Sequence, residues 1–365
     1  MIRPELISEF RNYVNSNEWT LFAYKNVDNR NQWNCICSAM DWIEVSAIYL
    51  SKHPLSGVTS DMSIEVFSYI ACVDIIVEAI EQLHRVIYKT NERVFDQDND
   101  CFPENLFQQN DREYFKNIRA CFGAHPVNLH DPEEPDNKYA KRFASWSGGG
   151  IGKGDFSVVL YSNKVGGNNI ILGIEFAQLA AFADKYYSHL TQIKNELNSQ
   201  YEEFCSRKRN EKFSCIGDPL ARLRILKEES SIRLDNDYYR ISIDELIRTL
   251  ETPITCEANK ALVDRYYNHL ETVIDEIHEN LQTMNFKDLK DDTVDFSAKQ
   301  IPLPNGWVYW VEKLNDARLG LGYHEIVWGR RIRELFEGWF VFQYESNQEL
   351  YVLVQAALYA MSCSE

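Results

Sequence analysis

Apolar positions recur at helical spacing along most of the chain. Between residues 33 and 50 they fall three or four apart, which predicts one buried helix face. The next helix is expected over 64–87, and its first half is apolar on most sides, so we expect it in the middle of a bundle. Its second half carries Glu78, Glu81, His84 and Arg85.

The pattern changes to β-rich runs at Phe156-Ser-Val-Val-Leu-Tyr-Ser and Asn169-Ile-Ile-Leu-Gly-Ile-Glu. The turn-forming Asn-Lys-Val-Gly-Gly-Asn between them predicts a β-hairpin at about 155–175. One long helix is expected to follow, over 176–207. The glycine-rich stretch before the hairpin, Ser147 to Asp155, departs from a phosphate-binding P-loop because Lys153 is followed by Gly154 and a strand. We interpret it as a loop.

The second half is helical again, with recognisable helix starts. Gly217-Asp-Pro is expected to begin one helix, Ser242-Ile-Asp-Glu resembles a capping box, and Pro253 precedes a long helix to about Met284. The apolar run 350–361 predicts a packed terminal helix. The sequence therefore predicts a mainly α fold: an N-terminal helix and loop (1–32), a helical bundle with a small inserted β-hairpin (33–210), and a second helical domain (211–365).

Charge and cysteine content limit the classes of function. The formal net charge of −17 argues against broad affinity for nucleic acid or an anionic membrane. The chain has no run of 18 uncharged apolar residues and no N-terminal signal pattern, so we expect no membrane span. Nine scattered cysteines indicate reduced thiols in a cytoplasm. Cys35-Ile-Cys37 lacks zinc-ligand spacing, and we expect neither a metal nor a cofactor.

The densest basic cluster is Arg330, Arg331 and Arg333, beside Trp328. Such a cluster can contact phosphate. The alternative is a solvated helix face on which these arginines pair with Glu334 and Glu337.

The stretch 111–130 combines a helix with a strong stop. Tyr114, Phe115, Ile118 and Phe122 have nearly helical spacing, and Gly123 and Pro126 then end the helix. Arg119 and His125 lie six residues apart, about 120° on an unbroken helix, so they converge only if the helix ends between them. Alternatively, His125 serves as an ordinary C-terminal cap of the helix.

An arginine and a histidine are the residue types that RNA cleavage without a metal requires. The 2′-hydroxyl must lose a proton, the 5′-leaving oxygen must gain one, and charge on the phosphoryl oxygens must be stabilised. An imidazole performs either proton step, and a guanidinium presents a planar fork to the phosphoryl oxygens. A two-fold dimer would supply two copies of the histidine.

Arg119-Ala-Cys-Phe-Gly-Ala-His125-Pro126 resembles the motif of the HEPN superfamily, an Arg, four to six residues and a His at the end of a bundle helix. The resemblance covers about residues 33–210. Many members carry Asn after the Arg, where this chain has Ala120. The resemblance implies a helical bundle, a homodimer with facing motifs and a metal-independent ribonuclease of phage-defence, toxin–antitoxin or stress systems. Arg119 would then stabilise the scissile phosphate of an RNA substrate, His125 would act as general acid or base, and Glu78 or Glu81 would orient one of them.

Two alternatives stay open. The first is a non-catalytic helical protein that binds a partner or regulator and keeps the motif only as structure. The second is a small-ligand site between helices, lined by the paired segments Asp184-Lys-Tyr-Tyr-Ser-His-Leu and Asp264-Arg-Tyr-Tyr-Asn-His-Leu. In this second alternative, His189 and His269 would face the ligand.

Overall fold

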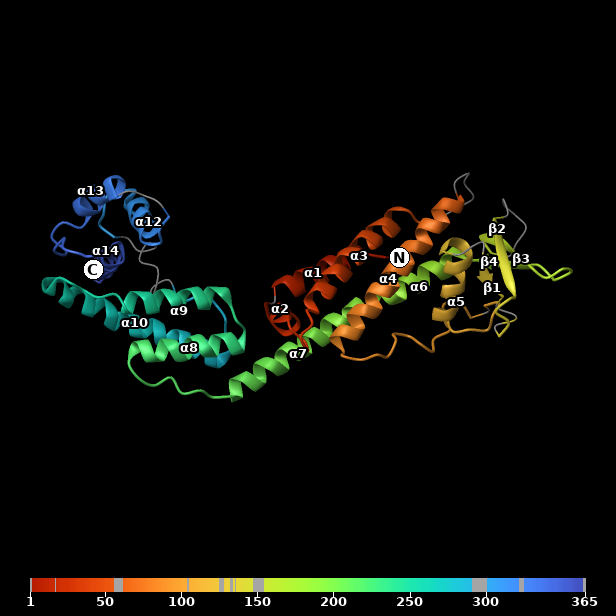
Figure 1. Cartoon of the computed structure of the whole chain (residues 1–365), viewed down its shortest axis with the longest axis horizontal. Coiled ribbons are helices and arrows are strands. Elements are labelled where there is room, and N and C mark those ends of the chain that lie inside the picture. The colour runs from red at the N-terminus through yellow and green to blue at the C-terminus, as the bar shows by residue number, and fades with distance from the viewer. Residues whose placement is uncertain are drawn as a thin grey trace. The chain divides into compact units, whose positions relative to one another are not determined.

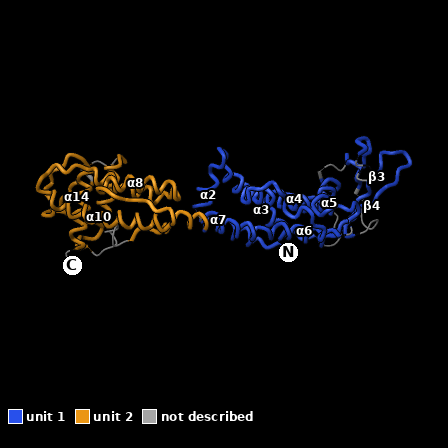
Figure 2. Tube along the Cα trace, turned by 90° about the horizontal axis from the view of Figure 1, so that it is seen from below, with its two compact units in different colours: residues 1–202 blue, residues 203–365 orange. Residues whose placement is uncertain are grey.

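The computed structural model describes residues 2–363 apart from 17, 56–61, 104, 125–127, 132–133, 135, 147–153, 291–300 and 322–324. The chain forms two compact units, residues 1–202 and 203–365 (Figure 2). Helices dominate both units, so the predicted mainly α class with a second helical unit is confirmed. The first unit includes the N-terminal helices that the sequence set apart as 1–32, and the division falls at 202 rather than 210.

The first unit is a helical bundle built around α4 (Figure 1). Its helices are α1 (Glu5–Ser16), α2 (Glu18–Tyr24), α3 (Trp33–Lys52), α4 (Met62–Ile87), α5 (Asp111–Arg119) and α6 (Phe176–Ser188), together with α7 (Leu190–Asn210) as far as residue 202. Helix α4 packs against α3, α5 and α6. It buries apolar side chains along its whole length, so its expected central position is confirmed: Val66, Ile70, Val73, Ile76, Val77, Ile80 and Leu83.

The long helix expected over 176–207 is interrupted at His189. Helix α6 ends at Ser188, and α7 begins at Leu190. The N–H of His189 donates to the carbonyl of Tyr186, three residues back, which tightens the chain locally. Apolar periodicity continues through this point, with Tyr186, Tyr187 and Leu190 all buried, so the sequence pattern contains no sign of the break.

The predicted hairpin is present within a larger antiparallel sheet. Its strands are β1 (Leu129–His130), β2 (Lys141–Trp146), β3 (Phe156–Ser162) and β4 (Ile170–Ile174), in the order β1-β2-β3-β4. Strands β3 and β4 pair with Val158 opposite Leu172, which confirms the hairpin. Strands β1 and β2 were not predicted, because β1 has two residues and β2 mixes charged, small and aromatic residues. Residues 147–153 of the predicted glycine loop lie outside the described residues.

In the second unit one long helix and one shorter helix pack against the terminal helix. It contains α8 (Pro219–Arg233), α9 (Asp237–Leu250), α10 (Glu257–Thr283), α12 (Trp307–Arg318), α13 (Glu325–Leu335) and α14 (Asn347–Ser362). Helix α14 contacts α10 and α12, and its apolar residues join one core with Trp328 and Phe336, so the predicted packed terminal helix is confirmed.

Two of the predicted helix starts in this unit are confirmed and one is wrong. Asp218 caps α8 by accepting from the N–H of Ala221, and α10 begins soon after Pro253. The capping-box prediction at Ser242 is wrong, since α9 starts at Asp237 under a cap from Asn236 and runs through Ser242. No helix in the described part of the chain is long and apolar enough to cross a membrane.

Candidate functional site

The site predicted from sequence begins on α5. The side chain of Asn110 caps this helix by accepting from the N–H of Glu113. After Arg119 the helix widens into a π turn over Ala120–Ala124, a form that is rare and frequent at functional sites. Gly123 lets the π turn approach α4 closely, because a Cβ at this position would lie 2.9 Å from the Phe67 ring and would force that ring to shift. His125 lies outside the described residues.

Arg119 is held by a carboxylate of α4 that the sequence analysis did not single out. Its Nη1 donates to both Oδ1 and Oδ2 of Asp74, each at 2.9 Å. The Arg119 side chain keeps 39 % of its surface exposed, and Asp74 keeps 20 %. The guanidinium is therefore fixed in direction by Asp74 and still reachable from solvent.

Glu78 and Glu81, expected to orient the catalytic pair, contact Arg112 instead. Nε of Arg112 donates to Glu81 at 2.9 Å, and its Nη2 donates to Glu78. Arg112 is almost fully buried. Burial alone would lower the pKa of Arg112, but hydrogen bonds and charge from Glu81 and Glu78 outweigh it and raise that pKa. These two carboxylates thus anchor the start of α5, and Asp74 holds its end.

The basic cluster of α13 pairs with carboxylates. Arg330 and Arg331 both donate to Glu334, at 2.8 and 2.6 Å. These hydrogen bonds lower the pKa of the Glu334 carboxyl. The Arg333 guanidinium lies over the Phe342 ring at 5.2 Å and within 3.9 Å of Glu325. The pairing with Glu334 matches the solvated-face alternative, and phosphate contact by these arginines stays a prediction.

Two histidines, His84 and His189, are in contact near the C-terminal end of α4. Nδ1 of His84 lies 3.1 Å from Nε2 of His189, so one ring donates and the other accepts. His84 stacks on Tyr88, and Phe95 packs edge-on against His189. Burial lowers the pKa of both histidines. The charge of Glu92 partly opposes this lowering at His84, whereas the charge of His84 lowers the pKa of His189 further. The lowered pKa values favour the neutral rings, and the contact joins α4 to the α6–α7 junction.

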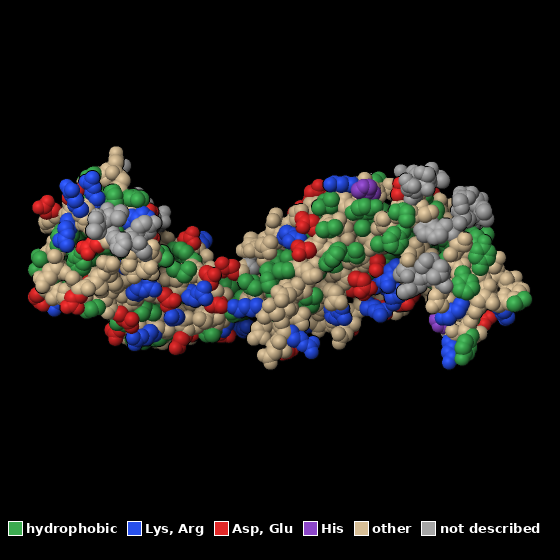
Figure 3. All heavy atoms as spheres, turned by 45° about the horizontal axis from the view of Figure 1, so that its top comes forward, with side chains coloured by type: hydrophobic (Ala, Val, Ile, Leu, Met, Phe, Trp, Pro, Cys, Tyr) green, Lys and Arg blue, Asp and Glu red, His purple; other side chains and the backbone are tan. Residues whose placement is uncertain are grey.

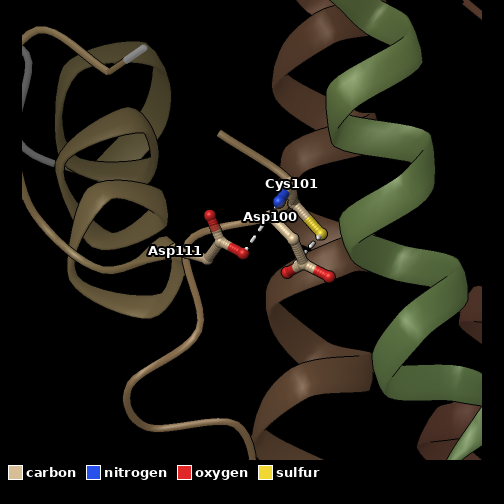
Figure 4. A group of neighbouring side chains, drawn as sticks. All are labelled: Asp100, Cys101 and Asp111. Carbon is tan, nitrogen blue, oxygen red and sulfur yellow. Dashed lines mark hydrogen bonds between the residues drawn. The ribbon is translucent and has the colours of Figure 1, made fainter. Parts of the chain in front are cut away.

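Asp100, Cys101 and Asp111 place possible metal-ligand atoms within 4.8 Å of one another (Figure 4). The Asp111 carboxylate already accepts the backbone N–H groups of Cys101 and Phe102, both at 2.9 Å. The Lys185 ammonium pairs with Asp100. Burial and the charges of Asp111 and Asp100 raise the pKa of the Cys101 thiol to about 12, which disfavours the thiolate. We interpret the cluster as a structural clasp between the 91–110 loop and α5.

An apolar groove runs between α3 and α4 beside Arg119. Its volume is about 380 Å³, and its lining includes small residues: Cys35, Ser38, Ala39 and Ala79. Asp74 and Glu78 also line it, as does Trp42, which is 56 % exposed. Figure 3 shows hydrophobic side chains gathered over this part of the first unit. Val45, Ile64 and Phe67 extend this surface, which we call the α3–α4 face; they are 62 %, 66 % and 42 % exposed.

Comparison of the chain with protein-family models, with curated proteins and with solved structures finds no match.

The Arg112 anchor generates a stability prediction. Arg112→Met leaves Glu81, whose side chain is only 14 % exposed, without its guanidinium. We expect the free energy of unfolding in urea to fall by about 3 kcal/mol. The matched control is Arg93→Met, which removes a solvent-exposed pair with Glu113 and should cost below about 1 kcal/mol. Equal losses in the two variants would contradict the anchoring role of Arg112.

The histidine pair generates a pH prediction. Because the folded-state pKa of both rings is lowered, their stabilising effect is complete above the unfolded value of about 6.5 and is lost as pH falls through the lowered pKa. Thermal unfolding at pH 7.5 and pH 5 should show a larger drop for the natural chain than for the double variant His84→Gln, His189→Gln. An identical drop in Tm for both proteins would show that protonation of the histidine pair does not destabilise the fold.

Proposed function

We propose that this protein is a metal-independent endoribonuclease of the HEPN type, acting as a homodimer in the cytoplasm. The observation that supports it is the position of Arg119. Its guanidinium is half-exposed, oriented by Asp74, and placed where α5 opens into a π turn, six residues before His125. A phage-defence, toxin–antitoxin or stress role, in which RNA cleavage is kept latent, is part of the same proposal.

Arg119 would bind the scissile phosphate. Asp74 engages one nitrogen, Nη1, and a planar guanidinium presents its other donors along separate edges. An arginine fixed in this way loses little conformational entropy when it binds, so it is pre-organised for a phosphoryl group. The negative charge of Asp74 also weakens the attraction of Arg119 for phosphates elsewhere on the RNA. This agrees with the net negative charge of the chain.

Two histidines would carry the two proton transfers. One imidazole removes the proton of the ribose 2′-hydroxyl, and the 2′-oxygen then attacks phosphorus. The bond from phosphorus to the 5′-oxygen breaks, and a protonated imidazole gives that oxygen its proton. The products are a 2′,3′-cyclic phosphate and a 5′-hydroxyl. Each chain offers one such histidine, His125, so the second would come from a second copy.

The α3–α4 face is where we propose that the second copy docks. An isologous two-fold interface needs complementary features on one surface. This face carries an exposed ring, Trp42, at a groove whose lining includes four small residues. The face also includes Asp74, which binds Arg119, and Phe67, which packs under Gly123. A contact across it would bring the two arginine–histidine segments toward each other.

A second candidate function is a non-catalytic helical protein that binds another protein or a regulator. The same exposed apolar face favours it, because contiguous apolar surface of this kind marks interaction sites. In this case the Arg119–Asp74 pair would serve only to fasten α5 to α4.

RNA cleavage distinguishes the two candidates. In EDTA, single-stranded RNA of mixed sequence should give fragments with 2′,3′-cyclic phosphate ends. We expect His125→Ala and Arg119→Ala each to lower the rate by roughly 100-fold or more. His53→Ala, a change of an exposed histidine at the end of α3, should leave the rate unchanged. Absence of cleavage at any protein concentration, or equal cleavage by His125→Ala, would exclude the nuclease.

The dimer has its own test. The natural chain should have the mass of a dimer by light scattering after chromatography, and Trp42→Glu should have that of a monomer, because a charge on the α3–α4 face cannot be buried unpaired. Trp339→Glu, at a ring 38 % exposed in the second unit, is the control and should stay dimeric. A natural chain that is monomeric at high concentration would contradict the two-histidine mechanism.

A further inference from the structure

The second unit contains a partly open cavity that the nuclease proposal does not use. It has a volume of about 250 Å³ and lies between α9, α10 and α14. Apolar walls come from Leu246 of α9 and from Leu270 and Val273 of α10. Leu270 and Val273 are buried, whereas Ile241, which also borders the cavity, is 64 % exposed. The cavity is therefore a core feature with an opening to solvent at Ile241.

The polar groups around this cavity are uncharged or neutralised. Among the described residues of its wall, Glu245 is the one carboxylate, and it pairs with Arg318 at 2.8 Å and with Arg248 at 3.0 Å. Two phenol rings, Tyr266 and Tyr351, also line it. Burial raises the pKa of both phenols, so both stay protonated. A ligand in this cavity meets hydroxyl groups and a compensated ion pair.

The Tyr351 ring is held rigidly. The Arg318 guanidinium lies 4.1 Å from its centroid and is itself fixed by hydrogen bonds to Asn315 and Gln348. Tyr266 packs against Tyr359 at 6.1 Å between centroids. The aromatic part of the wall is therefore pre-formed, which lowers the entropic cost of binding.

We propose that this cavity binds a small, neutral, aromatic molecule of one or two rings that carries a hydroxyl or N–H group. An apolar cavity of about 150 Å³ already admits benzene, so the volume here accommodates two fused rings. Larger ligands such as nucleotides occupy pockets of about 300–1,000 Å³, and their phosphates would meet no cation among the lining residues that the structure describes. The hydroxyl or N–H of the ligand would bond Ser242, Tyr266 or Gln355.

The proposed site differs in its lining residues from the ligand site expected from the repeated Tyr-Tyr segments. Tyr266 and Leu270 of the second segment line the cavity, but its His269 stacks on Tyr359, with ring centroids 4.5 Å apart. In the first segment His189 is engaged with His84. Phenol and leucine side chains, rather than the histidines, form the proposed site. The proposal is independent of the nuclease.

The test uses the full chain with indole and 2-naphthol as probes, and cyclohexanol as a non-aromatic comparison. Each aromatic probe should raise Tm with increasing concentration, by about 3 °C at ten times its Kd, and cyclohexanol should raise it less. Ser242→Phe, which fills the cavity from α9, should abolish the shift. Ser231→Phe places the same ring on an exposed position of α8 and should retain it.

The result is interpretable even if Ser242→Phe fails to fold. Val273→Leu adds one methylene group to the same space and should weaken probe binding at least 3-fold with the fold intact. No shift with either aromatic probe up to its solubility limit would overturn the proposal. An equal shift in the natural chain and in a folded Ser242→Phe variant would overturn it as well.

Discussion

The first unit depends on a row of carboxylates on α4 that faces two arginines of α5. Asp74, Glu78 and Glu81 lie on the side of α4 that meets α5, and they engage Arg119 and Arg112, seven residues apart. Arg112 is removed from water and needs its carboxylate partners, so this pairing favours one rotation and one register of α5 against α4. The Asn110 cap and the Asp111 clasp fix the start of the same helix.

This pairing gives the two arginines different roles. Arg112 is buried between two carboxylates and is a structural anchor. Arg119 has one carboxylate partner and keeps much of its surface exposed at the start of the π turn. In our proposal the anchor holds α5 so that Arg119 points to a substrate phosphate. The α3–α4 face begins at the same Asp74, and a proposed two-fold contact there would connect dimer formation with assembly of the site.

Helical periodicity predicted most of this architecture. It placed the buried faces of α3 and α4 and the terminal helix α14, and strand composition placed the β3–β4 hairpin. It did not reveal the interruption at His189, because the apolar spacing continues through that residue. It also did not reveal that α9 starts at Asp237, because Ser242 lies in a sequence that resembles a capping box inside the helix. In the candidate site, Arg119 was predicted, but its partner Asp74 was not. Three carboxylates at helical spacing lie on α4, and only the packing of α5 decides which one meets which arginine.

The central claim is that Arg119 is held for a phosphate and not only for the fold. The most direct test is equilibrium binding of a non-cleavable 2′-O-methyl RNA, measured by fluorescence anisotropy in EDTA, together with urea unfolding of the same samples. Our account predicts that Arg119→Ala weakens RNA binding at least 10-fold and lowers the free energy of unfolding by no more than about 1 kcal/mol. Unchanged RNA affinity with a clear loss of stability would contradict it and assign Arg119 to the fold alone.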